Sequence, residues 1–430
     1  MFDQQGLSLD QAPPVSVVFG LFLTGALFGL LSAIAVLYFG DSVLDSTSAG
    51  AMITAHLLSL GFAMSFMLGA LFQMLPVIAG VILQNPLPRS NSIKALLSLG
   101  VLSLIAAFAS NTGFLFLLAS VSLGASLLYV AWTMGNRLIR LNSHSASSRG
   151  MLYALFSLAL LVLLALYLTT TYAQMHSGVY FAVVKQLHYS FALFGWMMLL
   201  IISISFQTVE MFYVTPPYPK LLSRHAAPTI FAWLIITSVA TLFDDTAARY
   251  MMVLLYGVYG IYGIYTLIRL SQRKRPLTDA TVWFWRIGMG SLVITMMLLV
   301  THAWIDNNTV LKVIVVLFVS FVLSVILSMF YKIVPFLTWF HLNAQGYFTA
   351  PMMHEVIHPK TAKKHLWIHT AMVASLLLSI LLPFAIYLSG MLMLLSFGWV
   401  AYQILHANRL YRHTQQTGER FEMQMDLLPR

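Results

Sequence analysis

Three histidines lie within long apolar stretches of this sequence, and imidazole is a side chain well suited to binding a metal. His56 and His188 occur early in two of these stretches, and His302 ends a third. Neutral imidazole is the usual axial ligand of haem b, and it also binds copper and zinc. An ionisable side chain inside a membrane span is costly and is by default a functional candidate. The alternative is that each ring hydrogen-bonds a backbone carbonyl or lies at the level of the lipid headgroups.

The sequence contains no cysteine, which limits the groups that could hold a cofactor. This absence excludes disulfides, thiolate metal ligands, iron–sulfur clusters held by cysteine and haem attached through a C-x-x-C-H motif. Any cofactor must be held by histidine, methionine, oxygen ligands or the backbone. Haem b, copper and zinc are all compatible with these donors.

The composition is that of a polytopic membrane protein. The chain is 60% hydrophobic and 8% charged, with a mean hydropathy of +0.85. Apolar stretches of about 20 residues are long enough to cross the hydrocarbon core. We predict an all-α fold with one membrane domain over residues 1–430. Its twelve spans lie approximately at 15–39, 51–83, 91–109, 112–136, 151–173, 185–213, 227–243, 247–270, 281–304, 309–340, 365–387 and 389–408.

The positive charges predict the orientation. Of the 23 Lys and Arg, 18 fall in the alternate set of connections that includes both termini: Arg89, Lys94, Arg137, Arg140, Arg149, Lys220, Arg224, Arg269, Arg273, Lys274, Arg275, Lys360, Lys363, Lys364, Arg409, Arg412, Arg420 and Arg430. The opposite connections carry mostly acids: Asp41, Asp45, Asp244, Asp245 and Asp306. This positive-inside pattern predicts cytoplasmic termini in a bacterial-type inner membrane. Because the basic residues form no single patch, nucleic acid is not an expected partner, whereas the lipid bilayer is.

One span recurs three times along the chain. Gly61-Phe62, Phe72-Gln73 and Pro76 recur 134 positions later as Gly195-Trp196, Phe206-Gln207 and Glu210, and a further 125 positions later as Ser320-Phe321, Tyr331-Lys332 and Pro335. A small residue matches between them each time, namely Gly69, Ser203 and Ser328. The repeat predicts three pseudo-symmetric arcs of four helices, approximately 1–137, 138–270 and 271–430. With the orientation above, His56, His188 and His302 all fall in the outer third of their spans and can converge in one layer.

The run from His56 to Asn91 resembles a known helix. It reads H-x4-GF, then FQMLPVIAG, then PLPRSN. This resembles the second helix of haem–copper oxidase subunit I, in which a histidine near the outer face ligates the low-spin haem and a VP-x3-G turn and PR-x-N come after it. Twelve helices in three arcs is also that family's architecture. The NnrS proteins, haem- and copper-containing relatives linked to nitric oxide stress, are similar in carrying H-x4-GF-type second helices. The resemblance implies a bound haem at His56 and a role in electron transfer or in handling a small gas such as nitric oxide.

The departures from that family bear on the chemistry. The oxidases carry an H-P-E-V-Y-like motif in helix six, paired histidines in helix seven and H-x-H in helix ten. This chain has His188-Tyr189-Ser190 in span six and no histidine inside spans seven and ten. A complete copper-B site is therefore missing, and oxygen reduction at a binuclear centre is not expected. A haem or metal held by His56 and His188, with His302 as a third candidate, remains the prediction.

Polar residues near the inner ends of the repeat offer a second hypothesis. Gln73, Gln207 and Lys332 share one repeat position, and Glu210 comes three residues after Gln207. We expect Lys332 and Glu210 to neutralise each other if the arcs are symmetric. These residues would line a proton or ion path in a cofactor-free transporter or assembly factor, or simply join the arcs by hydrogen bonds.

The sequence also contains H-E-x-x-H, the motif of zinc proteases, at His354-Glu355-Val356-Ile357-His358. The chemistry needs one helix that presents both imidazoles on one face, with the glutamate as general base. Pro351 and Pro359 bracket the motif in a short loop, which leaves little room for a substrate cleft. A surface metal site or a polar loop helix is the favoured interpretation. Enzymatic activity is left open, as are the redox partner and the gaseous ligand.

Overall fold

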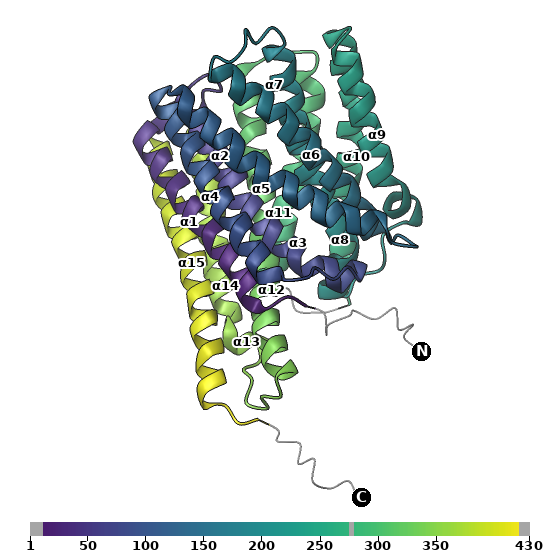
Figure 1. Cartoon of the computed structure of the whole chain (residues 1–430), viewed down its shortest axis with the longest axis vertical. Helices are drawn as coiled ribbons and strands as arrows, with labels where there is room; N and C mark the ends of the chain where they lie inside the picture. The colour runs from purple at the N-terminus through teal and green to yellow at the C-terminus, as the bar shows by residue number, and fades with distance from the viewer. Residues whose placement is uncertain (1–11, 275–278, 421–430) are drawn as a thin grey trace, which may run out of the picture.

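The computed structural model describes residues 12–274 and 279–420, and every regular element in these ranges is a helix (Figure 1). The elements are α1 (Val15–Phe39), the 3-10 helix η2 (Gly40–Leu44), α2 (Ala49–His56), the π-helix η3 (Leu57–Ala63), α3 (Met64–Ala79), α4 (Pro86–Ser110), α5 (Gly113–Ile139), α6 (Ala146–Tyr172), α7 (Phe181–Ser190), the π-helix η4 (Phe191–Met197), α8 (Met198–Tyr213), α9 (Lys220–Thr241), α10 (Asp245–Ser271), α11 (Ala280–His302), α12 (Asn308–Ala344), α13 (Met353–Val356), α14 (Pro359–Leu378) and α15 (Ala385–Thr417). Two of the inner charges, Arg275 and Arg430, and the chain termini lie outside the described ranges.

The protein is a polytopic membrane protein. Within the described ranges, ten helical units are long and apolar enough to cross a bilayer. The two remaining predicted spans coincide with α9 and α14, which fall short because polar residues occupy their first turns. Lys220, Arg224 and His225 begin α9, and three lysines come after Pro359 in α14. Ten crossings are therefore supported, while the count of twelve and the cytoplasmic termini stay predictions.

The helices form a ring around three inner units. The last helix, α15, packs against α1 and closes the ring, as the yellow and purple helices of Figure 1 show. The inner units are α2–η3–α3, α7–η4–α8 and α12, which are the three copies of the repeat. In their most apolar windows 83%, 72% and 67% of residues are buried, against 28% to 61% in the other spans. The repeat therefore marks the helices that other helices surround.

The π-helical segments match the repeat residue by residue. η3 covers Leu57–Ala63, and η4 covers Phe191–Met197, a displacement of 134 positions at both ends. The next helices, α3 and α8, are displaced by the same number. A π-helical turn inside an α-helix is rare and is frequent at functional sites. The first two copies of the repeat thus share an unusual backbone geometry, whereas α12 is α-helical throughout.

The small residues of the repeat explain how each inner unit packs. In the first arc Gly61 faces α1, and a Cβ added there would lie 2.7 Å from the Cβ of Phe28. In the second arc Gly195 faces α6, and an added Cβ would lie 2.8 Å from the Cβ of Ser157. Small residues let transmembrane helices approach closely enough for van der Waals contact along their length. In these two arcs the second span therefore packs against the first through a residue that cannot be larger.

The third arc makes the equivalent contact by hydrogen bonds. Ser320 Oγ lies 2.9 Å from Ser291 Oγ of α11, and Ser328 Oγ donates to the carbonyl of Thr281 at 2.8 Å. Both serines are fully buried. Serine hydroxyls are a common means of joining helices inside a membrane, where no water competes for them. In all three arcs the second span thus lies close to the first, through a glycine in two arcs and through serine hydrogen bonds in the third.

The two ends of the bundle differ in what they carry. The start of α1 and the end of α15 lie at the same end in Figure 1, and α13 lies at that end as well. The histidine-bearing elements α2 and α7 lie towards the other end. This arrangement matches an even number of crossings, with α2 and α7 towards the end opposite the start of α1 and the end of α15.

We expect Gly61→Ala to destabilise the protein by about 1–3 kcal/mol, because the new Cβ overpacks against Phe28. Gly257→Ala is the matched control, since a Cβ at Gly257 in α10 meets nothing within 4 Å. That substitution should be neutral or stabilise the helix by up to about 1 kcal/mol. Thermal unfolding of both variants in detergent measures the difference. Equal stabilities would contradict the packing role of Gly61.

Candidate functional site

His56 ends α2, and one of its two ring nitrogens is already committed. Its Nδ1 lies 2.7 Å from the carbonyl oxygen of Met52, one helical turn earlier. This contact favours the tautomer that carries its proton on Nδ1, which leaves a lone pair on Nε2. A histidine that ligates a metal usually donates its other N–H in this way. The ring of Phe108 lies beside it, with centroids 5.4 Å apart. His56 is thus half-buried and oriented as a ligand would be.

His188 lies in α7 of the second arc, near enough to His56 for a charge on one ring to affect the other. Its ring approaches the carbonyl of Leu161 in α6, while its Nδ1 is buried without a hydrogen-bond partner. A buried nitrogen without a partner is unusual and calls for an explanation, of which a bound ion is one. The two histidines are not equivalent by the repeat, because His56 corresponds to Ser190. Their proximity comes from the packing of the first arc against the second.

An aromatic cluster joins the two histidine-bearing elements. Phe108 of α4 and Phe116 of α5 pack around Tyr172 of α6, whose ring stacks on Phe116 at 4.9 Å. Tyr172 also contacts Phe181 of α7 edge to face at 5.4 Å. Aromatic pairs of this kind add about 0.5–1.5 kcal/mol each beyond burial. The cluster therefore links His56 of α2, through Phe108 and Tyr172, to Phe181 of α7.

His302 ends α11, apart from His56 and His188. Its Nε2 is 3.7 Å from a carboxylate oxygen of the exposed Asp306, and its Nδ1 is buried without a partner. Over residues 12–274 and 279–420, no three side chains of His, Asp or Glu lie close enough to hold a metal ion together. His302 therefore supplies no third ligand to His56 and His188 in this conformation.

The expected pairing of Lys332 with Glu210 is wrong. Lys332 instead donates to a carboxylate oxygen of Asp279 at 2.6 Å, and its ammonium lies 5.3 Å from the ring centroid of Tyr213. Asp279 immediately precedes α11 and caps it by accepting from the backbone N–H of Val282. The symmetry argument fails because a neighbouring helix of the same arc brings an acid closer than another arc does. Glu210 accepts instead from the backbone N–H of Tyr218 at 2.9 Å.

The glutamines of the repeat differ in their surroundings. Gln73 is fully buried, and neither its amide nitrogen nor its amide oxygen has a hydrogen-bond partner among the described residues. Gln207 is half-buried. Next to Gln73 in sequence, Phe72 and Pro76 line a cavity of about 210 Å³. A buried amide without partners normally binds water or an ion. Gln73 is therefore a polar group that the surrounding apolar helices leave unsatisfied.

Two buried histidines of α14 are the polar groups that the sequence did not single out as a site. His365 lies between the hydroxyls of Tyr331 and Ser396, each 2.7 Å from a ring nitrogen. His369 Nε2 lies 2.8 Å from Ser324 Oγ, and its Nδ1 has no partner among the described residues. The i,i+4 spacing was visible in the sequence, but their burial was not. Their partners come from α12 and α15, which only the fold brings together.

The H-E-x-x-H motif does not form a zinc-protease helix. α13 ends at Val356, and His358 caps the next helix by accepting from the N–H of Lys360 at 3.1 Å. Glu355 is likewise used as a cap, since it accepts from the N–H of Met352 at 2.7 Å. The cause is Pro359, which begins α14 and disfavours helical geometry at the residue before it. The two imidazoles therefore do not share a helical face.

Two further histidines lie on the helices that contain spans seven and ten, although neither span was predicted to hold one. α9 begins before its predicted span and includes His225, and α12 continues beyond its span to include His341. The boundaries differ because both helices extend past their apolar stretches into polar turns. His225 is exposed and His341 lies in the last turn of α12, so neither adds a donor near His56 and His188.

Comparison of the chain with protein-family models and with curated proteins finds no match to either. The likeness to haem–copper oxidase subunit I therefore rests on the motifs of residues 56–91 and on the helical architecture alone. What it implies about cofactor and activity stays a proposal.

We expect Asp279→Asn to lower stability at neutral pH by about 1–2 kcal/mol, because Lys332 would lose its partner. The value is below that of a fully buried pair since the Asp279 side chain is 41% exposed and water screens the interaction. Burial works to raise the pKa of Asp279, but the Lys332 ammonium and hydrogen bonds outweigh it and hold the pKa below the usual 3.8.

The sign of the pH dependence comes from this lowered pKa. The ion pair adds stability above the ordinary carboxyl pKa of 3.8 and loses it as the pH falls through the lowered value. Thermal unfolding between pH 7 and pH 3 should therefore show an acid-dependent loss that Asp279→Asn lacks. Asp41→Asn, at an exposed loop aspartate, is the control and should keep the wild-type profile. A wild-type profile in Asp279→Asn would refute the assignment.

Proposed function

We propose that this protein binds haem b near the outer face of a bacterial-type inner membrane, with His56 and His188 as its candidate axial ligands. The observation that carries the proposal is the pairing of these two histidines from successive arcs, one with a lone pair left on Nε2 and the other with an unpartnered Nδ1. Imidazole is the usual axial ligand of haem b. The donor chemistry of these two side chains suits such a group.

The number of donors favours haem over a single metal ion. A mononuclear copper or zinc site draws three or four ligands from the protein. No group of three donors is present within the described ranges. Haem needs only one or two axial ligands, because the porphyrin supplies the other four. Copper bound by His56 and His188 alone is the less favoured form of the proposal.

The proposed role is electron transfer, or the binding and handling of a small ligand such as nitric oxide. A haem held by both histidines would supply a redox-active iron for electron transfer, whereas one held by a single histidine would leave a position for a diatomic gas. His56 and His188 would hold the group, and the ring of Phe108, which contacts His56 and Tyr172, would exclude water from the His56 side of the site. The missing copper-B residues argue against oxygen reduction at a binuclear centre. Twelve crossings with both termini in the cytoplasm complete the proposal.

The decisive experiment is a reduced-minus-oxidised visible spectrum with haem quantification on detergent-purified protein from a haem-replete host. We expect about one haem per chain in the wild type. His56→Ala should lose the haem or change its spectrum, because its Nε2 is the freest donor, and His188→Ala should do the same. His358→Ala, at an exposed loop histidine, is the control and should keep the wild-type spectrum.

A colourless wild-type protein without iron or copper would refute the proposal. Haem retained at wild-type levels in both His56→Ala and His188→Ala would refute the ligand assignment only. His302→Ala separates the third candidate, and we expect it to retain the haem because His302 pairs with Asp306 instead.

A cofactor-free transporter is the second candidate, and the buried amide of Gln73 favours it. That amide lacks partners among the described residues, and its neighbours in sequence Phe72 and Pro76 line a cavity of about 210 Å³ at the end of α3. The path would use Gln73, Gln207 and Glu210, whereas Lys332 is held by Asp279.

Glu210→Gln tests this second candidate, because the amide can still accept from the N–H of Tyr218 but cannot carry a proton away. We expect proton entry into pyranine-loaded proteoliposomes to fall at least tenfold in this variant if the path operates. Any visible spectrum should be unchanged. The same proton flux in wild type, Glu210→Gln and protein-free vesicles would exclude the path.

A further inference from the structure

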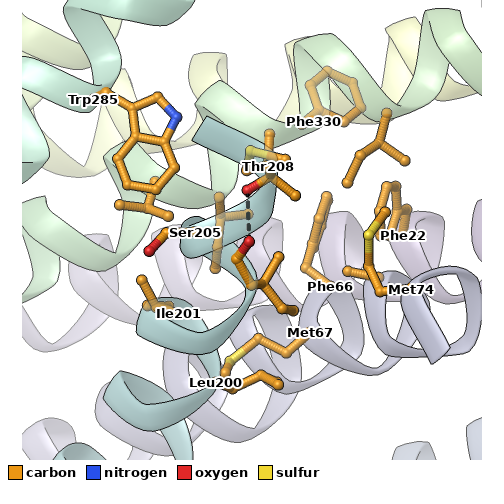
Figure 2. Close-up of a pocket in the computed structure, with 16 residues that line it drawn as sticks. Phe22, Phe66, Met67, Met74, Leu200, Ile201, Ser205, Thr208, Trp285 and Phe330 are labelled. Carbon is orange, nitrogen blue, oxygen red and sulfur yellow. Dashed lines mark hydrogen bonds between the residues drawn. The ribbon is translucent and has the colours of Figure 1, made fainter. Parts of the chain in front are cut away.

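A cavity of about 70 Å³ lies between the three inner helices (Figure 2). Its walls come from α3, α8 and α12, with Phe22 of α1 and Trp285 of α11 closing two of its sides. These three helices carry the repeat. The cavity therefore lies where a threefold axis relating the arcs would pass.

The lining of the cavity matches the repeat. Positions 66, 67, 70 and 74 of the first copy line it, and so do the positions 134 and 259 residues later. Two of these rings are Met67, Ile201 and Ile326, and Ala70, Ile204 and Met329. A cavity left by chance between irregular side chains would not take equivalent residues from all three helices. The axial cavity, as we name it, is thus a feature of the repeated architecture.

The ring of Ala70, Ile204 and Met329 faces open space. All three are half-buried, although they lie at the middle of the most buried helices in the described chain. Their neighbours in the cavity wall, such as Met67 and Ile201, are buried. The accessible surface of this ring is therefore surface of the cavity.

The hydroxyl groups at the wall are already satisfied, and the indole N–H of Trp285 is the one side-chain polar group of the lining without a partner among the described residues. Thr208 Oγ1 donates to the carbonyl of Ile204 at 3.0 Å, the dashed line in Figure 2. Ser205 Oγ donates to the carbonyl of Ile202 at 2.7 Å and accepts from the hydroxyl of Tyr262 at 2.8 Å. The remaining lining is aliphatic, aromatic or methionine, and no charged residue takes part. A water molecule needs two to four polar partners to be held, so this cavity does not suit water.

We infer that the axial cavity binds a small, uncharged, apolar molecule of the size of a xenon atom or a diatomic gas. Its volume is several times the roughly 10–15 Å³ that one water-sized probe requires. Apolar cavities stay dry and take up apolar ligands, as an engineered cavity of about 150 Å³ binds benzene and xenon. The axial cavity is smaller and so selects smaller molecules. Its lining contains neither His56 nor His188, so the inference does not depend on a bound haem.

Crystals of the full chain pressurised with xenon test the inference by anomalous scattering. We expect one xenon atom on the axis, within the ring of Ala70, Ile204 and Met329. Ala70→Leu adds three carbon atoms into the cavity and should lower xenon occupancy at least tenfold. Ala79→Leu is the matched control on the same helix, because Ala79 is also half-buried but does not line the cavity. It should keep the wild-type occupancy.

A second variant guards against failure of Ala70→Leu to fold. Ile204→Ala occupies the equivalent position in the second copy and enlarges the cavity, so it should raise xenon occupancy at a given pressure. Xenon absent from the axis in both wild type and Ile204→Ala, or xenon unaffected by Ala70→Leu, would overturn the inference. The same measurement on His56→Ala should be unchanged from wild type, which separates this inference from the haem proposal.

Discussion

The close approach of the first and second spans within each arc is the constraint on which the rest of the structure depends. Inside a bilayer there is no hydrophobic drive between helices, so association rests on van der Waals contact and on interhelical hydrogen bonds. Gly61 and Gly195 provide the first, and Ser320 provides the second. This contact draws one span of each arc inward, and the three inward spans then leave the axial cavity between them. The positions of the histidines depend on the same contact, because α2 and α7 begin two of these spans.

Symmetric packing does not make the three arcs chemically alike. The first two copies carry a π-helical segment shortly after a histidine, and the third does not. At the positions in α12 that correspond to His56 and His188 the chain has Val315 and Val313. The third arc instead carries the buried pair His365 and His369 on α14, a later helix of the same arc. His56 and His188, near the junction of arcs one and two, therefore have no counterpart in the third arc, although the helices of the three arcs pack alike.

The sequence predicted the elements that depend on local pattern and missed contacts that depend on the fold. Apolar length located the long helices of the described ranges, and the three copies of the repeat, from which arcs were predicted, are the most buried of the candidate spans. The partner of Lys332 was missed because Asp279 is 53 positions away and belongs to a polar connection rather than to a span. His365 begins the predicted span 365–387, but the apolar pattern does not say which face of that helix is interior, and only Tyr331 and Ser396 identify His365 as buried between helices. The aromatic cluster around Tyr172 draws on four helices and has no signature along the chain.

The separation of the two candidate sites limits how they can work together. His56 lies beside Phe108, near the junction of two arcs, whereas the axial cavity is lined by Phe66, Leu200 and other residues of the inner helices. The first two copies of the repeat reach both places, since η3 and η4 lie between the histidines and the cavity-lining turns of α3 and α8. A π-helical turn accommodates more residues than an α-helical turn, so it shifts the register of the helix after it relative to the helix before it. The histidines can therefore face the arc junction while the residues about ten positions later face the axis. The helix α12 has no such segment, so one α-helical register continues along it through the residues that line the axial cavity.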